Sequence, residues 1–512
     1  MRNLLSALVL AALLSAAAGA ETRPVTLLFT NDFESAFDPT EAYWREDIEY
    51  IGGIAHLATL IEQYRDSEET TFLFDAGDIF TGTLSKLTKG ELPFELMITL
   101  DYDAMSIGNH EFEYGWLEFA AQKNRASFPV LGANLYYKGT DHPYAQPWAI
   151  VERNGIRIGV IGILGRDAAT ALIPSNIAGV DVRDPAPIVT ELVRMLRPDV
   201  DLVVLLTHQG ETAPMQTDDE GRPEVRRDID ADIALAGVVA GIDVLLGGHA
   251  DAGTREPVVH PETGTIIMQT FGQGQHLGVL RLDVDVDGGG VENFDGRLVT
   301  VDSNALAPHR LVQEKIDRYR SRFREYYEPI ATTESGITRR YDTESDLGNL
   351  FADILRIEAG TPIALMPSGA LRRDLPAGEV TLIDLLDAFP FTDRVAIVEL
   401  SSGALLDIVE QGLSLERGML QVSGLEVRYD RSKPVGRRIA GIEVAGQPLR
   451  LDGTYRVATL EILAQGGDAY TAFGRGTLES MSEKRFADVL EAWFREQDVV
   501  TVPPRGRLVP VP

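Results

Sequence analysis

Residue types that bind divalent cations recur in the first half of the chain, each shortly after an apolar segment. In chain order they are Asp32 and Glu34, Asp78, Asn109 with His110, His208, and His249 with Asp251. One such residue alone is more typical of a helix cap or a turn. Together, their carboxylates would repel one another unless cations lay between them. Two cations about 3.5–4 Å apart can clamp a phosphoryl oxygen and activate water. The pattern therefore predicts a hydrolytic site of two divalent metal ions.

The apolar segments before these residues predict the strands that position them. They are short and continuous, at residues 25–30, 71–74, 104–107, 156–163, 202–206 and 244–246. Runs of this kind are typical of strands buried on both faces. Helical patterns lie between them, for example at residues 53–64 and 187–196. The alternation predicts an α/β sandwich whose polar loops gather at one end of the sheets, where ligands bind.

The length of 512 residues predicts two or three domains. We expect the first domain at residues 24–305, followed by a charged helical linker at 306–331. Strand and helix patterns alternate again afterwards, which predicts a smaller, mixed α/β domain at 332–501. The Pro-rich end, residues 502–512, predicts an extended tail.

The composition excludes several classes of function. The formal net charge is −31, which argues against nucleic acid and against an anionic membrane surface as partners. A small phosphate ester can still bind if metal ions reverse the charge locally. Cysteine is absent, so disulfides, thiolate nucleophiles and Cys-ligated metals are excluded.

The first 20 residues have the pattern of a secretory signal peptide. Arg2 precedes an apolar run at residues 4–14, and small residues end at Ala18-Gly19-Ala20. A membrane anchor is the alternative, but the run falls short of the roughly 20 residues that span a bilayer. No other stretch is apolar enough to insert into a membrane. We expect cleavage near Ala20 and a periplasmic or secreted protein.

The motifs themselves resemble those of a known family. Asn31-Asp32-x-Glu34, Gly77-Asp78, Gly108-Asn109-His110-Glu111, Thr207-His208 and Gly247-Gly248-His249-x-Asp251 look like the calcineurin-like metallophosphoesterase series. With Ser368-Gly369-Ala370-Leu371-Arg372 and Gly466-Gly467-Asp468-Ala469-Tyr470, the chain resembles the secreted 5′-nucleotidase/UDP-sugar hydrolase family over residues 24 to 500. The resemblance implies a metallophosphoesterase domain followed by a C-terminal 5′-nucleotidase domain.

The resemblance also implies two sets of metal ligands. Asp78 would bridge both cations, and Asn109, His208 and His249 would complete the shell of the second. The first normally takes Asp32 and two histidines, which this chain replaces with Glu34 and Asp251. Because oxygen ligands suit hard cations, this position is expected to favour Mn, Mg or Ca, whereas the other can take Zn, Co or Mn.

The remaining family residues imply catalytic and substrate roles. His110 would stabilise charge at the scissile phosphate or protonate the leaving group, oriented by Glu113 where the family usually has Asp. Arg372, Phe391 and Asp468 match substrate-binding positions, and Arg339 or Arg340 would add a phosphate contact. Asp393 stands where the family has Asn, and Ile462 where it has an aromatic residue. Phe391 and Ile462 could instead be core residues, and Asp393 a turn residue.

These differences bear on the substrate. Losing one ring would forfeit about 1–3 kcal/mol of base stacking, so a sugar phosphate, sugar nucleotide or polyol phosphate fits better than in a standard member. The hypothesis is an exported dimetal phosphohydrolase that cleaves a phosphomonoester, favouring a 5′-nucleotide or related nucleotide or sugar phosphate, by attack of metal-bound water. The alternatives are a thiosulfohydrolase of the same superfamily and a catalytically silent nucleotide- or sugar-binding protein.

Overall fold

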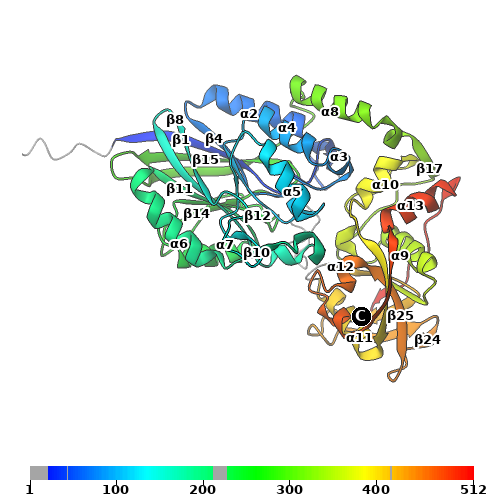
Figure 1. The fold of residues 1–512 in the computed structure, drawn as a ribbon. Helices are drawn as coiled ribbons and strands as arrows, with labels where there is room; N and C mark the ends of the chain where they lie inside the picture. The colour runs from blue at the N-terminus through cyan, green and yellow to red at the C-terminus, as the bar shows by residue number, and fades with distance from the viewer. Residues whose placement is uncertain (1–20, 43, 211–227, 416–417, 512) are drawn as a thin grey trace, which may run out of the picture.

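The computed structural model describes residues 21–42, 44–210, 228–415 and 418–511. The predicted signal peptide lies outside these residues. The chain forms a larger N-terminal and a smaller C-terminal α/β part, which confirms the predicted fold class (Figure 1). Within the described residues, no helix is both long enough and apolar enough to cross a membrane.

Two six-stranded sheets pack face to face in the N-terminal part. The first has the order β16-β15-β1-β4-β5-β6 and the second β13-β14-β12-β11-β9-β8. Their bounds are β1 Thr22–Thr30, β4 Thr71–Asp75, β5 Ala104–Ser106, β6 Val130–Leu131, β8 Trp148–Arg153, β9 Ile156–Leu164, β11 Leu202–Gln209, β12 Val244–His249, β13 Val258–Val259, β14 Ile266–Gln269, β15 His276–Asp285 and β16 Val291–Thr300. The strands that lead into the predicted site run parallel to one another within each sheet: β1 with β4 and β5, and β11 with β12.

Both faces of the interior strands are buried, for example in β4 and β11, which explains their continuous apolar sequences. In β11, Val204 and Leu206 face the other sheet, whereas Val203 and Leu205 pack against the outer helices. Helices α2 Ile54–Ser67, α4 Glu91–Thr99 and α5 Trp116–Gln122 cover the first sheet, and α6 Pro185–Leu196 and α7 Asp230–Val238 cover the second.

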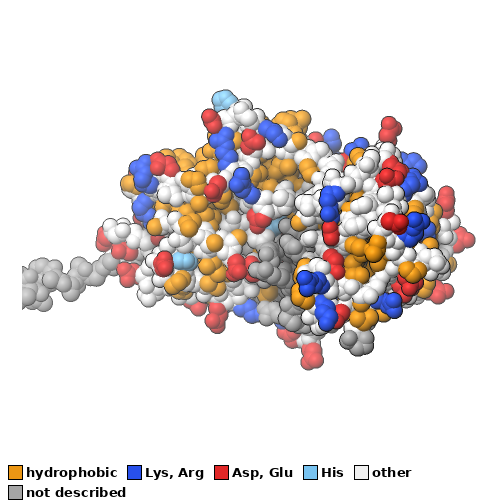
Figure 2. Space-filling view, turned by 90° about the horizontal axis from the view of Figure 1, so that it is seen from below, with side chains coloured by type: hydrophobic (Ala, Val, Ile, Leu, Met, Phe, Trp, Pro, Cys, Tyr) orange, Lys and Arg blue, Asp and Glu red, His pale blue; other side chains and the backbone are white. Residues whose placement is uncertain are grey.

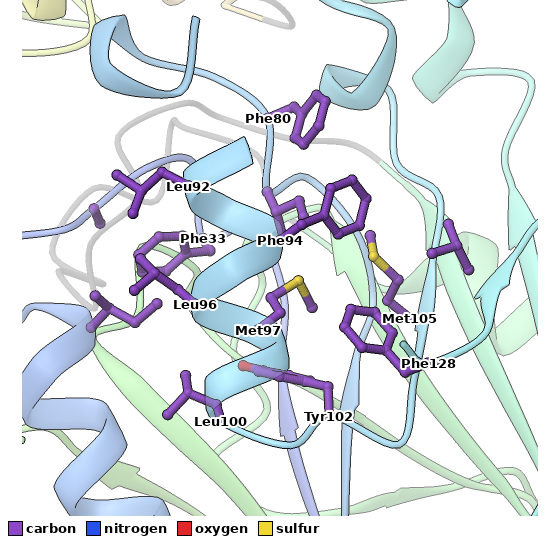
Figure 3. Close-up of a cluster of buried hydrophobic side chains, with 14 of the residues drawn as sticks. Phe33, Phe80, Leu92, Phe94, Leu96, Met97, Leu100, Tyr102, Met105 and Phe128 are labelled. Carbon is purple, nitrogen blue, oxygen red and sulfur yellow. The ribbon is translucent and has the colours of Figure 1, made fainter. Parts of the chain in front are cut away.

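The cluster around α4 also anchors two loops of the predicted site (Figure 3). Phe33 lies between Asp32 and Glu34 in sequence, and Phe80 follows Asp78 by two residues. Both rings are buried in this cluster, with Leu96 and Phe94 of α4. Core packing therefore holds the backbone that carries the candidate ligands.

Helix α8, Arg310–Arg322, lies within the predicted linker and packs on the N-terminal part. Val312, Ile316 and Tyr319 are buried in the same cluster as α2 and α4. Its cationic residues Lys315 and Arg318 both pair with Glu95 of α4, at 2.6 Å. The helix is therefore attached to the first domain along its length, and the chain leaves that domain after it.

The C-terminal part is built on a mixed five-stranded sheet, β21-β18-β25-β20-β26, with two smaller sheets. The strands are β17 Pro329–Thr333, β18 Ile363–Pro367, β19 Gly378–Thr381, β20 Arg394–Ser401, β21 Leu420–Ser423, β22 Leu425–Tyr429, β23 Ile439–Val444, β25 Thr454–Leu460, β26 Thr477–Arg485 and β28 Leu508–Pro510. The helices are α9 Asp346–Ala359, α10 Leu382–Ala388, α11 Ser402–Ser414, α12 Glu461–Ala464 and α13 Phe486–Arg495. Strand β28, at the Pro-rich end, pairs with β22, so this end is extended but docked on the domain.

Charged side chains of both signs lie on the exposed surface, for example in the ion pairs of Arg194 with Glu191 and of Arg310 with Glu314. Figure 2 shows one face on which basic side chains are interspersed with acidic ones.

Candidate active site

The predicted metal ligands meet at the carboxyl ends of the parallel strands. Each follows or ends β1, β4, β5, β11 or β12, and all seven are buried. One cavity is lined by six of them, namely Asp32, Glu34, Asp78, Asn109, His249 and Asp251. His208 is fully buried and lies behind this wall, with Asp78 and His249 close enough to share a cation.

His208 has the orientation of a metal-binding histidine. Its Nδ1 lies 2.8 Å from the backbone carbonyl of Ala76. A carbonyl can only accept, so Nδ1–H donates and Nε2 faces the site. Nε2 lies 3.0 Å from Asp78 Oδ2 and 3.0 Å from Asn109 Oδ1. A backbone acceptor that fixes the ring in this way is typical of metal ligands.

Two groups of side chains in the described residues can hold a cation, and they share Asp78. One is Asp78, His208 and His249, and the other is Glu34, Asp78 and His110. Glycines bring the backbone close to these oxygens: a Cβ on Gly108 would lie 2.2 Å from Asp78 Oδ1, and one on Gly272 would lie 2.4 Å from Asp251 Oδ1. Carboxylates and imidazoles packed this closely fit a pair of divalent cations.

Five of the predicted ligands have a left-handed backbone. The φ angles are 49° at Asp32, 45° at Glu34, 64° at Asp78, 73° at His249 and 50° at Asp251. For residues other than glycine such conformations cost about 1–3 kcal/mol each, and they concentrate at functional sites. The fold therefore gives up stability to turn these side chains into the cavity.

Burial makes the site electrostatically costly without cations. Burial raises the pKa of Asp32 to about 7, with a further contribution from Asp78. For His208, burial lowers the pKa, but the carboxylates of Asp78 and Asp32 outweigh it and raise the value to about 10. Positive charge is therefore favoured within this cluster, and the binding of cations is expected to release protons from it.

Glu111 is a positioning residue that the motif contained without an assigned role. Its buried carboxylate accepts the N–H groups of Gly108 at 2.6 Å, Ile79 at 2.8 Å and Asp78 at 2.9 Å. It thereby ties the loop after β4 to the loop after β5. The only sequence signal was an acidic residue inside an otherwise ligand-bearing motif.

His110 lies between two carboxylates. Its Nδ1 is 3.2 Å from Glu113 Oε2, as expected for an orienting pair, and its Nε2 is 3.2 Å from Glu34 Oε1. Burial would lower the pKa of His110, but Asp78, Glu113 and Glu34 raise it well above the ordinary value. The imidazole is therefore held as a cation, with Nε2 directed into the cavity.

The C-terminal part supplies the opposite wall of the same cavity. Its lining includes the predicted substrate residues Arg372, Phe391, Asp393, Ile462 and Asp468, together with Tyr341 and Leu460, which no motif indicated. The guanidinium of Arg372 lies 5.3 Å from the centre of the Phe391 ring, a cation–π arrangement. Phe391 and Ile462 also pack against the hydrophobic core. Each of them is therefore both a cavity-lining residue and a core residue.

Asp393 lines the cavity, whereas Arg340 is not among its lining residues. Asp393 Oδ1 accepts the N–H of Ile462 at 2.8 Å, which ties two segments of this wall together, and burial raises the pKa of Asp393 to about 8. The phosphate contact of Arg340 stays a prediction. The adjacent Arg339 donates its backbone N–H to Asp374 at 2.7 Å, which holds this segment at Asp374.

The fold and the site together define a two-domain, metal-dependent hydrolase. Residues 26–250 match the family model described as calcineurin-like phosphoesterase. Residues 329–475 match the model described as 5′-nucleotidase, C-terminal domain. The chain belongs to the 5′-nucleotidase family of calcineurin-like phosphoesterases, enzymes that hydrolyse phosphomonoesters.

Similar proteins extend over nearly the whole chain. The 5′-nucleotidase of Vibrio cholerae is 29% identical over 92% of this chain and 91% of its own length. The protein UshA of Escherichia coli is 25% identical over 95% and 94%. The crystal structure of a 5′-nucleotidase precursor from Thermus thermophilus superposes with a TM-score of 0.81, at 27% identity, and covers 96% of this chain and 99% of that one. The sulfate thiohydrolase SoxB of Thermus thermophilus, at 20% identity and a TM-score of 0.76 over 95% and 96%, shares the fold.

Proposed function

We propose that the protein is an exported phosphomonoesterase that acts on a 5′-nucleotide or a related nucleotide or sugar phosphate. The observation that carries the proposal is one cavity that has candidate metal ligands on one wall and candidate substrate-binding residues on the other. Asp32, Asp78 and Asn109 are on one wall, and Arg372, Phe391 and Asp468 are on the other. A phosphate would lie at the metal ligands while its organic part contacts the second domain.

The side chains divide the work of hydrolysis. Two divalent cations, when bound by Asp32, Glu34, Asp78, Asn109, His208, His249 and Asp251, would polarise the phosphoryl group and activate water. Arg372 would bind phosphoryl oxygens, for which its guanidinium geometry is suited. His110 would give the proton on Nε2 to the leaving-group oxygen, while Glu113 holds Nδ1.

The organic part of the substrate is inferred from the second wall. Phe391 offers one aromatic face, and Ile462 an aliphatic one. Asp468 offers a carboxylate acceptor, and Asp393, whose pKa is raised to about 8 by burial, offers a neutral acid. This set suits a hydroxylated sugar next to a base or another flat group, rather than a base stacked between two rings.

A panel of substrates tests the activity. The purified chain, without residues 1–20, is assayed with p-nitrophenyl phosphate, 5′-nucleotides, sugar nucleotides and sugar phosphates, with Mn, Mg, Ca, Zn and Co each supplied. We expect release of inorganic phosphate from at least one nucleotide or sugar ester. If every ester stays intact while nucleotides still bind, the silent binding protein is the correct alternative.

The two metal positions are expected to differ in preference. Glu34 and Asp251 stand where the family resemblance implies histidines, whereas His208 and His249 lie together with Asp78. Metal analysis of protein purified without added salts should find Mn, Mg or Ca at one position per chain. The double variant Glu34→His with Asp251→His should increase the zinc content. Two tightly held zinc ions in the unmodified chain would contradict the prediction.

A further inference from the structure

Glu34 makes contacts that a metal ligand does not require. Its Oε1 lies 3.2 Å from His110 Nε2, and Arg372 Nη1 of the other domain lies 3.4 Å from Oε2 and 3.5 Å from Oε1. The side chains of Glu34, His110 and Arg372 are 4%, 6% and 15% exposed, so water screens these contacts little. One carboxylate thus links the two domains inside the cavity.

The donors that meet at Glu34 form an anion site. Arg372 Nη2 and His110 Nε2 lie 3.4 Å apart, and Gln273 donates a further N–H to Glu34 Oε2 at 3.1 Å. Guanidinium and imidazole nitrogens at this distance from each other require an anion that both can reach. In the described structure that anion is the Glu34 carboxylate.

Arg372 and His110 are also the groups that the proposed function assigns to the phosphoryl oxygens and to the leaving-group oxygen of the substrate. We propose, on the basis of that function, that Glu34 occupies the phosphoryl subsite of the metal-free protein and that a cation opens the subsite by taking Glu34 as a ligand. Glu34 also lies with Asp78 and His110 in a group whose ligand atoms are within 4.8 Å of one another, so a cation bound there would compete with Arg372 for the same carboxylate. Metal and phosphate binding are then linked through one side chain.

Space lies on both sides of the Glu34 carboxylate. Glu34 and Arg372 line the main cavity and also a smaller one, whose other residues include Ser35, Gln273 and Arg373. The ion pair therefore lies between these two cavities at the domain boundary.

Calorimetric binding of inorganic phosphate to the full chain, stripped of metal with a chelator, tests the proposal without turnover. Glu34→Gln should bind phosphate at least about tenfold tighter than the unmodified chain, because the internal competitor loses its charge. Asp387→Asn is the matched control: it neutralises another carboxylate of the smaller cavity that Glu34 and Arg372 also line, while the ion pair between Glu34 and Arg372 stays in place. It should change the affinity by less than about threefold. Adding Arg372→Met to Glu34→Gln should remove the gain.

Manganese supplies the second arm of the experiment. It should tighten phosphate binding much more in the unmodified chain than in Glu34→Gln, because only the former has a carboxylate to withdraw. Equal gains for Glu34→Gln and Asp387→Asn would overturn the proposal, since they would show a general charge effect. Thermal unfolding verifies that all variants are folded. Because phosphate binding is measured directly, the proposal can fail while the hydrolase activity stands, or hold while the substrate panel fails.

Discussion

Replacing Asp78 by alanine is expected to remove bound metal and phosphoester turnover together. Asp78 is the residue shared by both groups that can hold a cation, and it also accepts the N–H of His110 at 2.7 Å. Without it, neither cation has a complete set of ligands and the developing phosphoryl charge is unbalanced. Turnover should fall by more than about 10³-fold, measured together with the metal content per chain.

Asp75 offers a close control for this variant. It is buried at the end of β4, three residues before Asp78, but it accepts hydrogen bonds from Thr30 and Gly77 instead of lining the cavity. Burial raises its pKa to about 8, so it is mostly a neutral acid at pH 7 and asparagine is a near match. Asp75→Asn should keep both metals and most of the activity. If Asp78→Ala also keeps them, Asp78 is not a ligand.

The second large effect is expected at His110. His110→Ala should lower kcat by about 10²- to 10⁴-fold, which is the usual contribution of a positioned general acid. The rate falls because the variant lacks the proton at Nε2 of His110, which the neighbouring carboxylates of Glu113 and Glu34 keep on the ring. Metal content should be unchanged. Loss of one cation would instead show that His110 is a ligand in the group with Glu34 and Asp78.

The leaving group separates the two roles of His110. Nitrophenolate leaves without protonation, whereas a nucleoside or sugar alkoxide requires a proton. His110→Ala should therefore impair nucleotide or sugar phosphate hydrolysis much more than that of p-nitrophenyl phosphate. Equal losses would assign His110 to stabilising charge on the phosphoryl group. Glu113→Gln should show the same dependence with a smaller amplitude, because it acts only through the orientation of His110.

The sequence was sufficient for the strand ends that carry the ligands. A continuous apolar run buried on both faces must be an interior strand, and the carboxyl ends of parallel strands meet at one edge. Asp32, Asp78 and His249 could therefore be placed together from local pattern alone. The chain length and the alternating patterns after residue 331 predicted a second domain, and the two family models match separate segments, at residues 26–250 and 329–475.

Contacts within a loop cluster were harder to predict. Glu111 binds three backbone N–H groups from two loops, and Asp393 binds that of Ile462. Such contacts depend on the path of the backbone, and no side-chain spacing encodes them. The left-handed φ angles of the ligands could not be predicted from the sequence either, because only the packing around these residues makes such conformations tolerable.

By itself, the sequence determined which residues can bind metal and which strands present them, because periodicity and residue chemistry are local properties. Only the tertiary structure decided that Glu34 meets Arg372, which is 338 positions later in the chain. It also decided that Arg340 lies outside the cavity lining and that helix α8 packs on the first domain. These outcomes follow from packing between segments that are far apart in the chain, and that packing depends on the shape and charge of whole surfaces rather than on any short segment.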